Sequence, residues 1–265
     1  MFAINPFAAL STTVPTGVMQ TYVVIMIFLV AAGTLFDIVH KGSAKYFFNN
    51  FRTPKGRPVG GGELASIAVK TAVVDVLASG EFCNARRRVA HLLTMYGFIL
   101  HAVSTVVMVF NPSADSLWAH LWWIGGLMVL VGGYWFWFFI RVDVAAEGSS
   151  PFRVMRADLF ILSLLASVTL ALLWAWLGGM VLFALYILAT TVLFGSVPWS
   201  KFAHMFFKPA AAFEKRVSEA NGTHENLPTL TRDDPEQRER HSMELLKDAP
   251  MDMGLGIKRE APRHY

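Results

Sequence analysis

The chain has 265 residues, of which 54% are hydrophobic and only 16% are charged, and its mean hydropathy is +0.46. Soluble domains carry about 25% charged residues and about 45–50% apolar ones. The composition therefore excludes a soluble globular enzyme and indicates an integral membrane protein. The single cysteine excludes an internal disulfide, and it excludes an iron–sulfur cluster or a cysteine-based zinc site held by this chain alone, because those sites need several thiolates.

Five apolar stretches predict membrane-spanning helices. A bilayer core about 30 Å thick needs roughly 20 apolar residues in a helix, and a helix satisfies its own backbone polar groups in lipid. The stretches are 19–39, 89–110, 117–140, 159–176 and 180–198, and a Leu-Gly-Gly turn separates the last two. The sequence thus predicts an all-α, five-helix transmembrane bundle over residues 19–207, preceded by a short segment, 1–18.

Lys and Arg are distributed unevenly among the connecting segments. Segment 41–88 contains nine of them against three acids, and the connection between the third and fourth helices carries Arg141, Arg153 and Arg156. The segments without Lys or Arg are 1–18, 111–116 and 177–179. Because Lys and Arg collect in cytoplasmic loops, we expect a multi-pass protein of the cytoplasmic (inner) membrane, with its N-terminus outside and its C-terminus in the cytoplasm. The net charge of +4 then reflects topology and does not indicate a nucleic-acid partner.

Two regions outside the predicted spans differ in character. Segment 41–88 begins as a Gly/Pro-rich loop and continues, from about Glu63 to Ala78, with an amphipathic helical pattern. Such a helix lies at the membrane surface or packs on a soluble partner, and the pattern leaves both open. The tail 208–265 carries ten Lys/Arg and eleven Asp/Glu. This composition predicts a tail that is disordered alone or becomes ordered against a partner.

Histidines are the candidate functional residues, because ionisable side chains at membrane depth are costly. The five at or inside the predicted membrane region are His40, His91, His101, His120 and His204. His91 and His204 are expected near the cytoplasmic ends of the second and fifth helices, at the matching depth that bis-histidine haem ligation requires. This requires the fifth helix to continue past Pro198, with Pro209 as its expected stop. His101 is expected roughly 15 Å deeper than His91. The alternative for the other histidines, and for His204, is an interfacial position among aromatic residues.

These residues resemble a known family. Two histidines ten residues apart on the second helix, and a histidine after Pro198-Trp-Ser-Lys-Phe-Ala, resemble the cytochrome b subunit of respiratory nitrate reductase and its relatives in heterodisulfide-reductase-like and quinone-interacting complexes of sulfur metabolism. The stretch 72–100, with Val-Val-Asp-Val-Leu, three arginines, His91 and Tyr-Gly-Phe, is also similar. The similarity covers about residues 60–210. Within this group, the short chain without a cysteine-rich domain most resembles the membrane anchor of adenylylsulfate reductase.

The resemblance implies cofactors and partners. One haem b would be held by His91 and His204, with both as iron ligands. A second haem would need His101 and the position that is Tyr186 here, so this haem lacks one histidine ligand. His101 is then a quinone hydrogen-bond donor, a remnant, or a helix-packing residue bonded to a neighbouring carbonyl. The partners would be cytoplasmic flavoprotein and iron–sulfur subunits that oxidise sulfite with AMP and pass electrons to a membrane quinone. No catalytic residue is assigned to this chain.

Two other functions remain open at this stage. A cofactor-free structural anchor would let quinone bind to the docked iron–sulfur subunit. A small transporter or channel would need polar groups or broken helices along a path through the bilayer. The glycine pairs at 125–126 and 132–133 indicate close helix packing rather than such a path.

Overall fold

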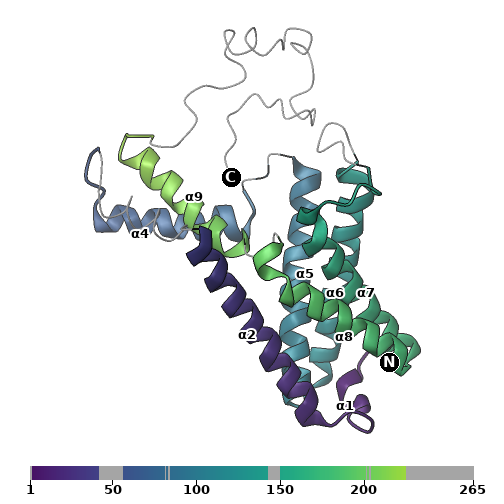
Figure 1. Ribbon diagram of the computed structural model, residues 1–265. Coiled ribbons are helices and arrows are strands. Elements are labelled where there is room, and N and C mark those ends of the chain that lie inside the picture. Colours follow the sequence, from purple (N-terminus) through teal and green to yellow (C-terminus); the bar gives the residue numbers. More distant parts are fainter. Residues whose placement is uncertain are drawn as a thin grey trace. The chain divides into compact units, whose positions relative to one another are not determined.

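The computed structural model describes residues 2–41, 56–80, 82, 84–142, 150–200, 202 and 204–224. Within these ranges the chain is helical and divides into two compact units. The first unit comprises residues 1–37, 89–136 and 154–203, and the second comprises 38–88, 137–153 and 204–265. Figure 1 traces the elements in chain order. The prediction of an all-α membrane protein is confirmed.

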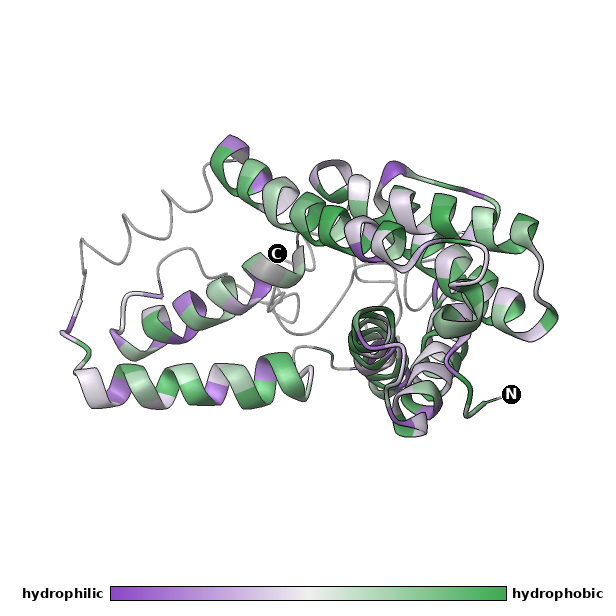
Figure 2. Cartoon of the chain, turned by 90° about the horizontal axis from the view of Figure 1, so that it is seen from below, coloured by the Kyte–Doolittle hydropathy of each residue, from purple (hydrophilic) through white to green (hydrophobic). Residues whose placement is uncertain are grey.

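Among the residues that the structure describes, four helices are long and apolar enough to cross a membrane. They are α2 (Thr16–Lys41), α5 (Ala85–Phe110), α6 (Ser116–Trp135, extended to Ile140 by the π-helical turn η2, Phe136–Ile140) and α7 (Leu159–Leu177). Each coincides with a predicted span to within a few residues. The protein is therefore a multi-pass membrane protein, and its spans are predominantly apolar in Figure 2.

The fifth predicted span is shorter than expected. Helix α8 (Met180–Gly195) has 16 residues, which corresponds to about 24 Å of helix. It follows α7 through Gly178 and Gly179, whose φ angles of +75° and +92° favour glycine. The count of five spans stays a prediction, because a helix of this length falls short of the bilayer core.

The expectation that the fifth helix continues past Pro198 is wrong. Helix α8 ends at Gly195, and the short 3₁₀ helix η4 (Val197–Trp199) follows. Proline removes a helical N–H and also disfavours helical geometry at the residue before it, which explains the break. His204 begins a separate helix, α9 (His204–Ala220). Pro209 lies inside α9 and does not end it.

Glycines on α6 bring three helices of the first unit together. A Cβ atom on Gly132 would lie 2.6 Å from the carbonyl oxygen of Ala90, and one on Gly125 would lie 2.6 Å from the backbone nitrogen of His101. The second glycine of each pair contacts α7. A Cβ atom on Gly126 would lie against Leu172, and one on Gly133 would lie against Leu165. The two glycine pairs, seven residues apart, thus allow both α5 and α7 to approach α6 closely, as predicted.

The N-terminal segment closes one end of this unit. Helix α1 (Pro6–Leu10) is capped by the side chain of Asn5, which also donates a hydrogen bond to the carbonyl of Met108 at the end of α5 (3.0 Å). The ring of Phe7 lies 6.1 Å from that of Trp122 and 5.5 Å from that of Trp174. Trp122 is fully buried, so this part of the aromatic cluster is core and not an exposed interfacial belt.

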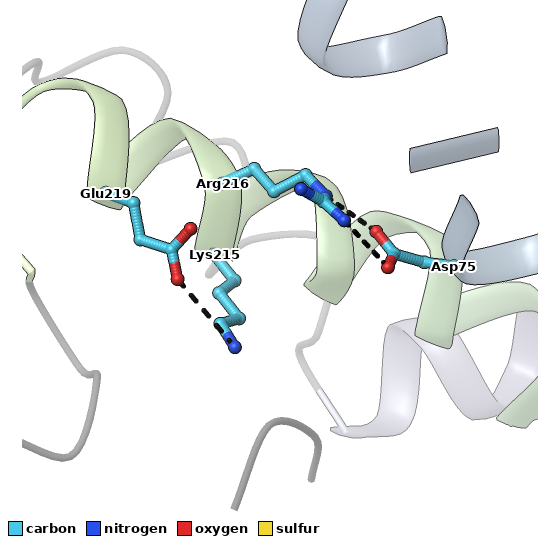
Figure 3. Close-up of polar contacts among 4 residues, drawn as sticks. All are labelled: Asp75, Lys215, Arg216 and Glu219. Atoms are coloured by element: carbon cyan, nitrogen blue, oxygen red, sulfur yellow. Dashed lines mark hydrogen bonds and ion pairs between the residues drawn. The ribbon is translucent and has the colours of Figure 1, made fainter. Parts of the chain in front are cut away.

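The second unit is a pair of helical segments. Helix α4 (Gly61–Lys70) continues without a break into the π-helix η1 (Thr71–Leu77), and α9 packs against both. The guanidinium of Arg216 on α9 donates two hydrogen bonds to the carboxylate of Asp75 on η1, at 2.6 and 2.9 Å (Figure 3). Arg57 pairs with Glu63 and lowers the pKa of that carboxyl.

The expectation that the tail is disordered from residue 208 is wrong for residues 208–220. These residues continue α9, because the chain's own α4 and η1 supply the apolar surface and the counter-charge that the tail lacks by itself. Residues 225–265 lie outside the described part of the chain. The predicted loop 53–62 is described only from Gly56 onward.

The Asp75–Arg216 pair leads to a testable expectation. Replacing Asp75 by asparagine removes the charge but keeps the shape, so α9 should open more often. For a partly exposed pair of about 1 kcal/mol, amides of α9 should exchange with deuterium roughly fivefold faster. The measurement is hydrogen exchange on the full chain in mild detergent. The charge-swapped double variant Asp75→Arg/Arg216→Asp should recover most of the protection, and unchanged exchange in Asp75→Asn would show that apolar packing alone holds α9.

Candidate functional site

The histidines singled out in the sequence fall in different parts of the structure. His101 is buried within the first unit, with 6% of its surface exposed. His91, on α5, is half-buried, whereas His40 and His120 are exposed. His204 is the first residue of α9, and its side chain lies outside the described part of the structure. The prediction that His91 and His204 bind one haem therefore stays a prediction, and the continuous fifth helix that it required is interrupted after Gly195.

The protonation of the His101 ring follows from its partner. Its Nδ1 lies 2.9 Å from the backbone carbonyl oxygen of Trp122 on α6. A carbonyl only accepts hydrogen bonds, so Nδ1 carries the proton and a neutral ring keeps its lone pair on Nε2. This is the helix-packing arrangement that the sequence left open for His101. In this state Nε2 is an acceptor, so neutral His101 cannot donate a hydrogen bond to a quinone from that atom.

Three hydrogen bonds join α5 and α6 around His101 in a closed ring. His101 donates to the Trp122 carbonyl, the Trp122 indole N–H donates to the Thr105 hydroxyl (2.9 Å), and that hydroxyl donates to the His101 carbonyl (2.7 Å). The imidazole also stacks on the indole, with ring centroids 4.6 Å apart. The ring satisfies each of these buried donors, which is what a low-dielectric interior requires.

A second group of hydroxyls adjoins this ring from α7 and α8. The Tyr186 phenol stacks against Trp174, with ring centroids 6.0 Å apart, and its hydroxyl interacts with the hydroxyls of Thr105 and Thr190. Thr190 donates to the Tyr186 carbonyl (2.8 Å), so the Ser167 hydroxyl is the donor in its 2.7 Å bond to Thr190. We call His101, Thr105, Trp122, Tyr186, Thr190 and Ser167 the buried polar cluster.

The buried polar cluster does not fit a second haem. Such a haem would lie between His101 and residue 186, with an axial ligand from each side. Instead, residue 186 is a tyrosine whose ring is buried and stacked on the Trp174 indole. Close packing of α6 against α5 occupies the other side, where a Cβ on Gly126 would lie 3.2 Å from the His101 Nδ1. Position 186 thus offers no histidine ligand, and the side chains beside His101 pack closely on one another.

Sequence reasoning identified His101 and Tyr186 but missed Thr105 and Trp122. The sequence contains a clue to the role of Thr105, because this residue follows His101 by four positions and so shares its helix face. The role of Trp122 had no such signal, because its partners lie on another helix. Within the described ranges, no three His, Cys, Asp or Glu side chains gather in one place.

Thr105 offers a direct test of the buried polar cluster. Thr105→Val keeps the shape but leaves the buried Trp122 indole N–H without its acceptor, so we expect a loss of about 1–2 kcal/mol of stability. The measurement is thermal unfolding in mild detergent. Thr105→Ser should retain most of the stability. Thr169→Val, which removes a hydroxyl pair with Tyr134 at the surface of the bundle, is the matched control and should change little. Equal effects in Thr105→Val and Thr169→Val would contradict a special role for the cluster.

Together the fold and the site define a multi-pass helical membrane protein with a histidine-centred polar cluster inside its bundle. Comparisons of the chain with protein families, with curated proteins and with solved structures found no match.

Proposed function

We propose that the protein is a membrane anchor and electron-transfer subunit. It would link a cytoplasmic flavin and iron–sulfur oxidoreductase, of the adenylylsulfate reductase type that oxidises sulfite, to quinone in the cytoplasmic membrane. The N-terminus would lie outside and the C-terminus in the cytoplasm, as the Lys and Arg distribution indicates. The chain would act as a non-catalytic or quinone-reducing subunit, and no catalytic residue is assigned to it.

The observation that carries the proposal is the second unit. A protein that only spans the membrane has no need of two long amphipathic segments outside its spans, locked together by a bidentate ion pair. Segment 41–88 carries nine Lys and Arg against three acids, so it would suit a soluble subunit of the opposite charge. The tail beyond residue 224 would extend the docking surface.

The haem b of this proposal would be held by His91 and His204. Two neutral imidazoles are a donor set that suits haem iron, and a bound haem would supply one-electron transfer. His91 lies on α5, a rigid membrane-spanning helix, which suits the orientation of a ligand. The buried polar cluster would keep α5 in place and would hold no iron itself.

The cofactor-free structural anchor is the second candidate. The tyrosine at position 186 favours it, because a second bis-histidine haem would lack one of its ligands. In that case quinone would bind to the docked iron–sulfur subunit. A transporter is less well supported, because the buried polar cluster is bonded to itself and does not form a polar path.

Purification of the native protein in mild detergent tests both candidates. We expect flavoprotein and iron–sulfur subunits to copurify, and a pyridine haem assay to find about one haem b per chain. Copurification of the same subunits without haem would support the cofactor-free structural anchor instead of the electron-transfer subunit. Purification of the chain without any soluble subunit, from membranes that contain such subunits, would refute both.

A further inference from the structure

The helical segment α4–η1 has a second apolar face that α9 does not cover. Asp75 lies on the side of the segment that packs against α9, and Thr71 and Ile67, four and eight residues before it, share that helix face. Residues two positions further along, about 200° around a helix, lie on the opposite side. There Ala65, Val69, Val73 and Leu77 are exposed, with 63% of Val69, 52% of Val73 and 51% of Leu77 accessible. We call these four residues the apolar stripe.

The π-helical geometry keeps this stripe straight. In an α-helix, residues spaced by four drift about 40° around the axis at each step, so a long stripe would wind away from one face. From Thr71 onward the segment is π-helical, and its wider turn reverses that drift. Val69, Val73 and Leu77 therefore stay on one side of the segment. A straight apolar stripe fits a flat surface.

Short connections join this segment and α9 to the helices of the predicted spans. Residues 78–84 join Leu77 to α5, and residues 196–203 join α8 to α9. A connection of seven residues reaches at most roughly 25 Å even when fully extended. Leu77 is therefore separated by only this length of chain from α5, a helix long and apolar enough to cross a membrane. A bilayer around α5 would be an apolar surface within reach of the stripe.

Cationic side chains accompany the apolar stripe in the second unit. The Arg87 guanidinium lies 5.8 Å and the Lys208 ammonium 5.4 Å from the centroid of the Phe82 ring. Lys70 is exposed on α4, beside the stripe. Long cationic side chains of this kind reach anionic headgroups while their helix lies in the interface.

We propose that α4–η1 lies in the bilayer interface, with the apolar stripe against the acyl chains and with Lys70, Arg87 and Lys208 at the headgroups of anionic phospholipids. The stripe would enter the boundary between headgroups and acyl chains by about 5–10 Å. Charge complementarity and the short tethers favour lipid over a protein partner as its occupant. This inference does not depend on the proposed function, because the apolar stripe takes no part in that proposal.

Depth-dependent fluorescence quenching tests the proposal on the full chain. In a Cys83→Ala background, Val73→Cys is labelled with an environment-sensitive dye, and the protein is reconstituted into vesicles of phosphatidylcholine and phosphatidylglycerol. Glu219→Cys, an exposed polar position on α9 of the same unit, is the matched control. Val69→Cys provides a second stripe position if Val73→Cys does not reconstitute.

A lipid with a nitroxide near its headgroup should quench the label on the stripe about threefold more than the label at position 219. A lipid with its nitroxide at the chain end should quench the stripe label less than the headgroup nitroxide does. Adding Val73→Glu should abolish this quenching for a label at position 69. Equal exposure of the stripe and control labels to aqueous iodide would overturn the proposal. A second result would also overturn the proposal. If neither the nitroxide lipids nor iodide quenched the stripe label in the complex with soluble subunits, but iodide quenched it in the isolated chain, a protein would cover the stripe.

Discussion

Replacing Gly132 by leucine should prevent α5 and α6 from packing, so that little folded protein is recovered in mild detergent. Even a Cβ atom at this position would lie 2.6 Å from the Ala90 carbonyl oxygen and 2.7 Å from the Thr94 hydroxyl. The first of these atoms belongs to the backbone of α5, so the clash is relieved only by moving the whole helix. We expect a loss at or above the upper end of the about 1–3 kcal/mol typical of overpacking.

Monodispersity in size-exclusion chromatography and the unfolding temperature measure this effect. Gly125→Leu should behave like Gly132→Leu, because a Cβ there would lie 2.6 Å from the His101 nitrogen. Gly17→Ala and Gly195→Ala are the matched controls, since a Cβ at either position would meet nothing within 4 Å. A Gly132→Leu protein as stable as the controls would show that α5 and α6 do not approach as closely as described.

Loss of haem from the purified complex is expected for His91→Ala and for His204→Ala, but not for His101→Ala. If the first two histidines are the axial ligands, removing either one leaves the iron with a single strong ligand and a labile haem. His101 instead donates its Nδ1 proton to the Trp122 carbonyl and stacks on that indole. His101→Ala should therefore lower the unfolding temperature while the haem content stays the same.

The readouts are haem content by the pyridine assay and the unfolding temperature, measured on the same preparations. His120→Ala is a control for losing an exposed histidine and should change neither value. If His101→Ala lost the haem and His91→Ala retained it, the haem would lie deeper in the bundle, and the packing argument at Tyr186 would be wrong. Retention of haem in all of the variants would refute histidine ligation by these residues.

Hydropathy located the long helices within a few residues, and the glycine pairs of α6 were correctly interpreted as packing sites. The end of α8 was misjudged because the apolar run continues to Pro198, whereas proline geometry stops the helix three residues earlier, at Gly195. The order of α9 was missed for a different reason. A polar tail with balanced charge has no apolar core of its own, and its apolar partner, α4–η1, lies more than 100 residues away in the sequence.

The amino-acid sequence by itself determined that the chain is helical and where its long apolar helices lie. Lipid offers the backbone no hydrogen-bond partners, so each apolar run has to bond within itself, and composition alone is sufficient to predict that. Only the tertiary structure decided which groups meet: the His101 ring with the Trp122 carbonyl, 21 residues on, and Arg216 with Asp75, 141 residues back. Such pairings depend on how helices rotate and pack against each other, and a glycine or a hydroxyl at the contact sets this geometry without changing the hydropathy of either helix.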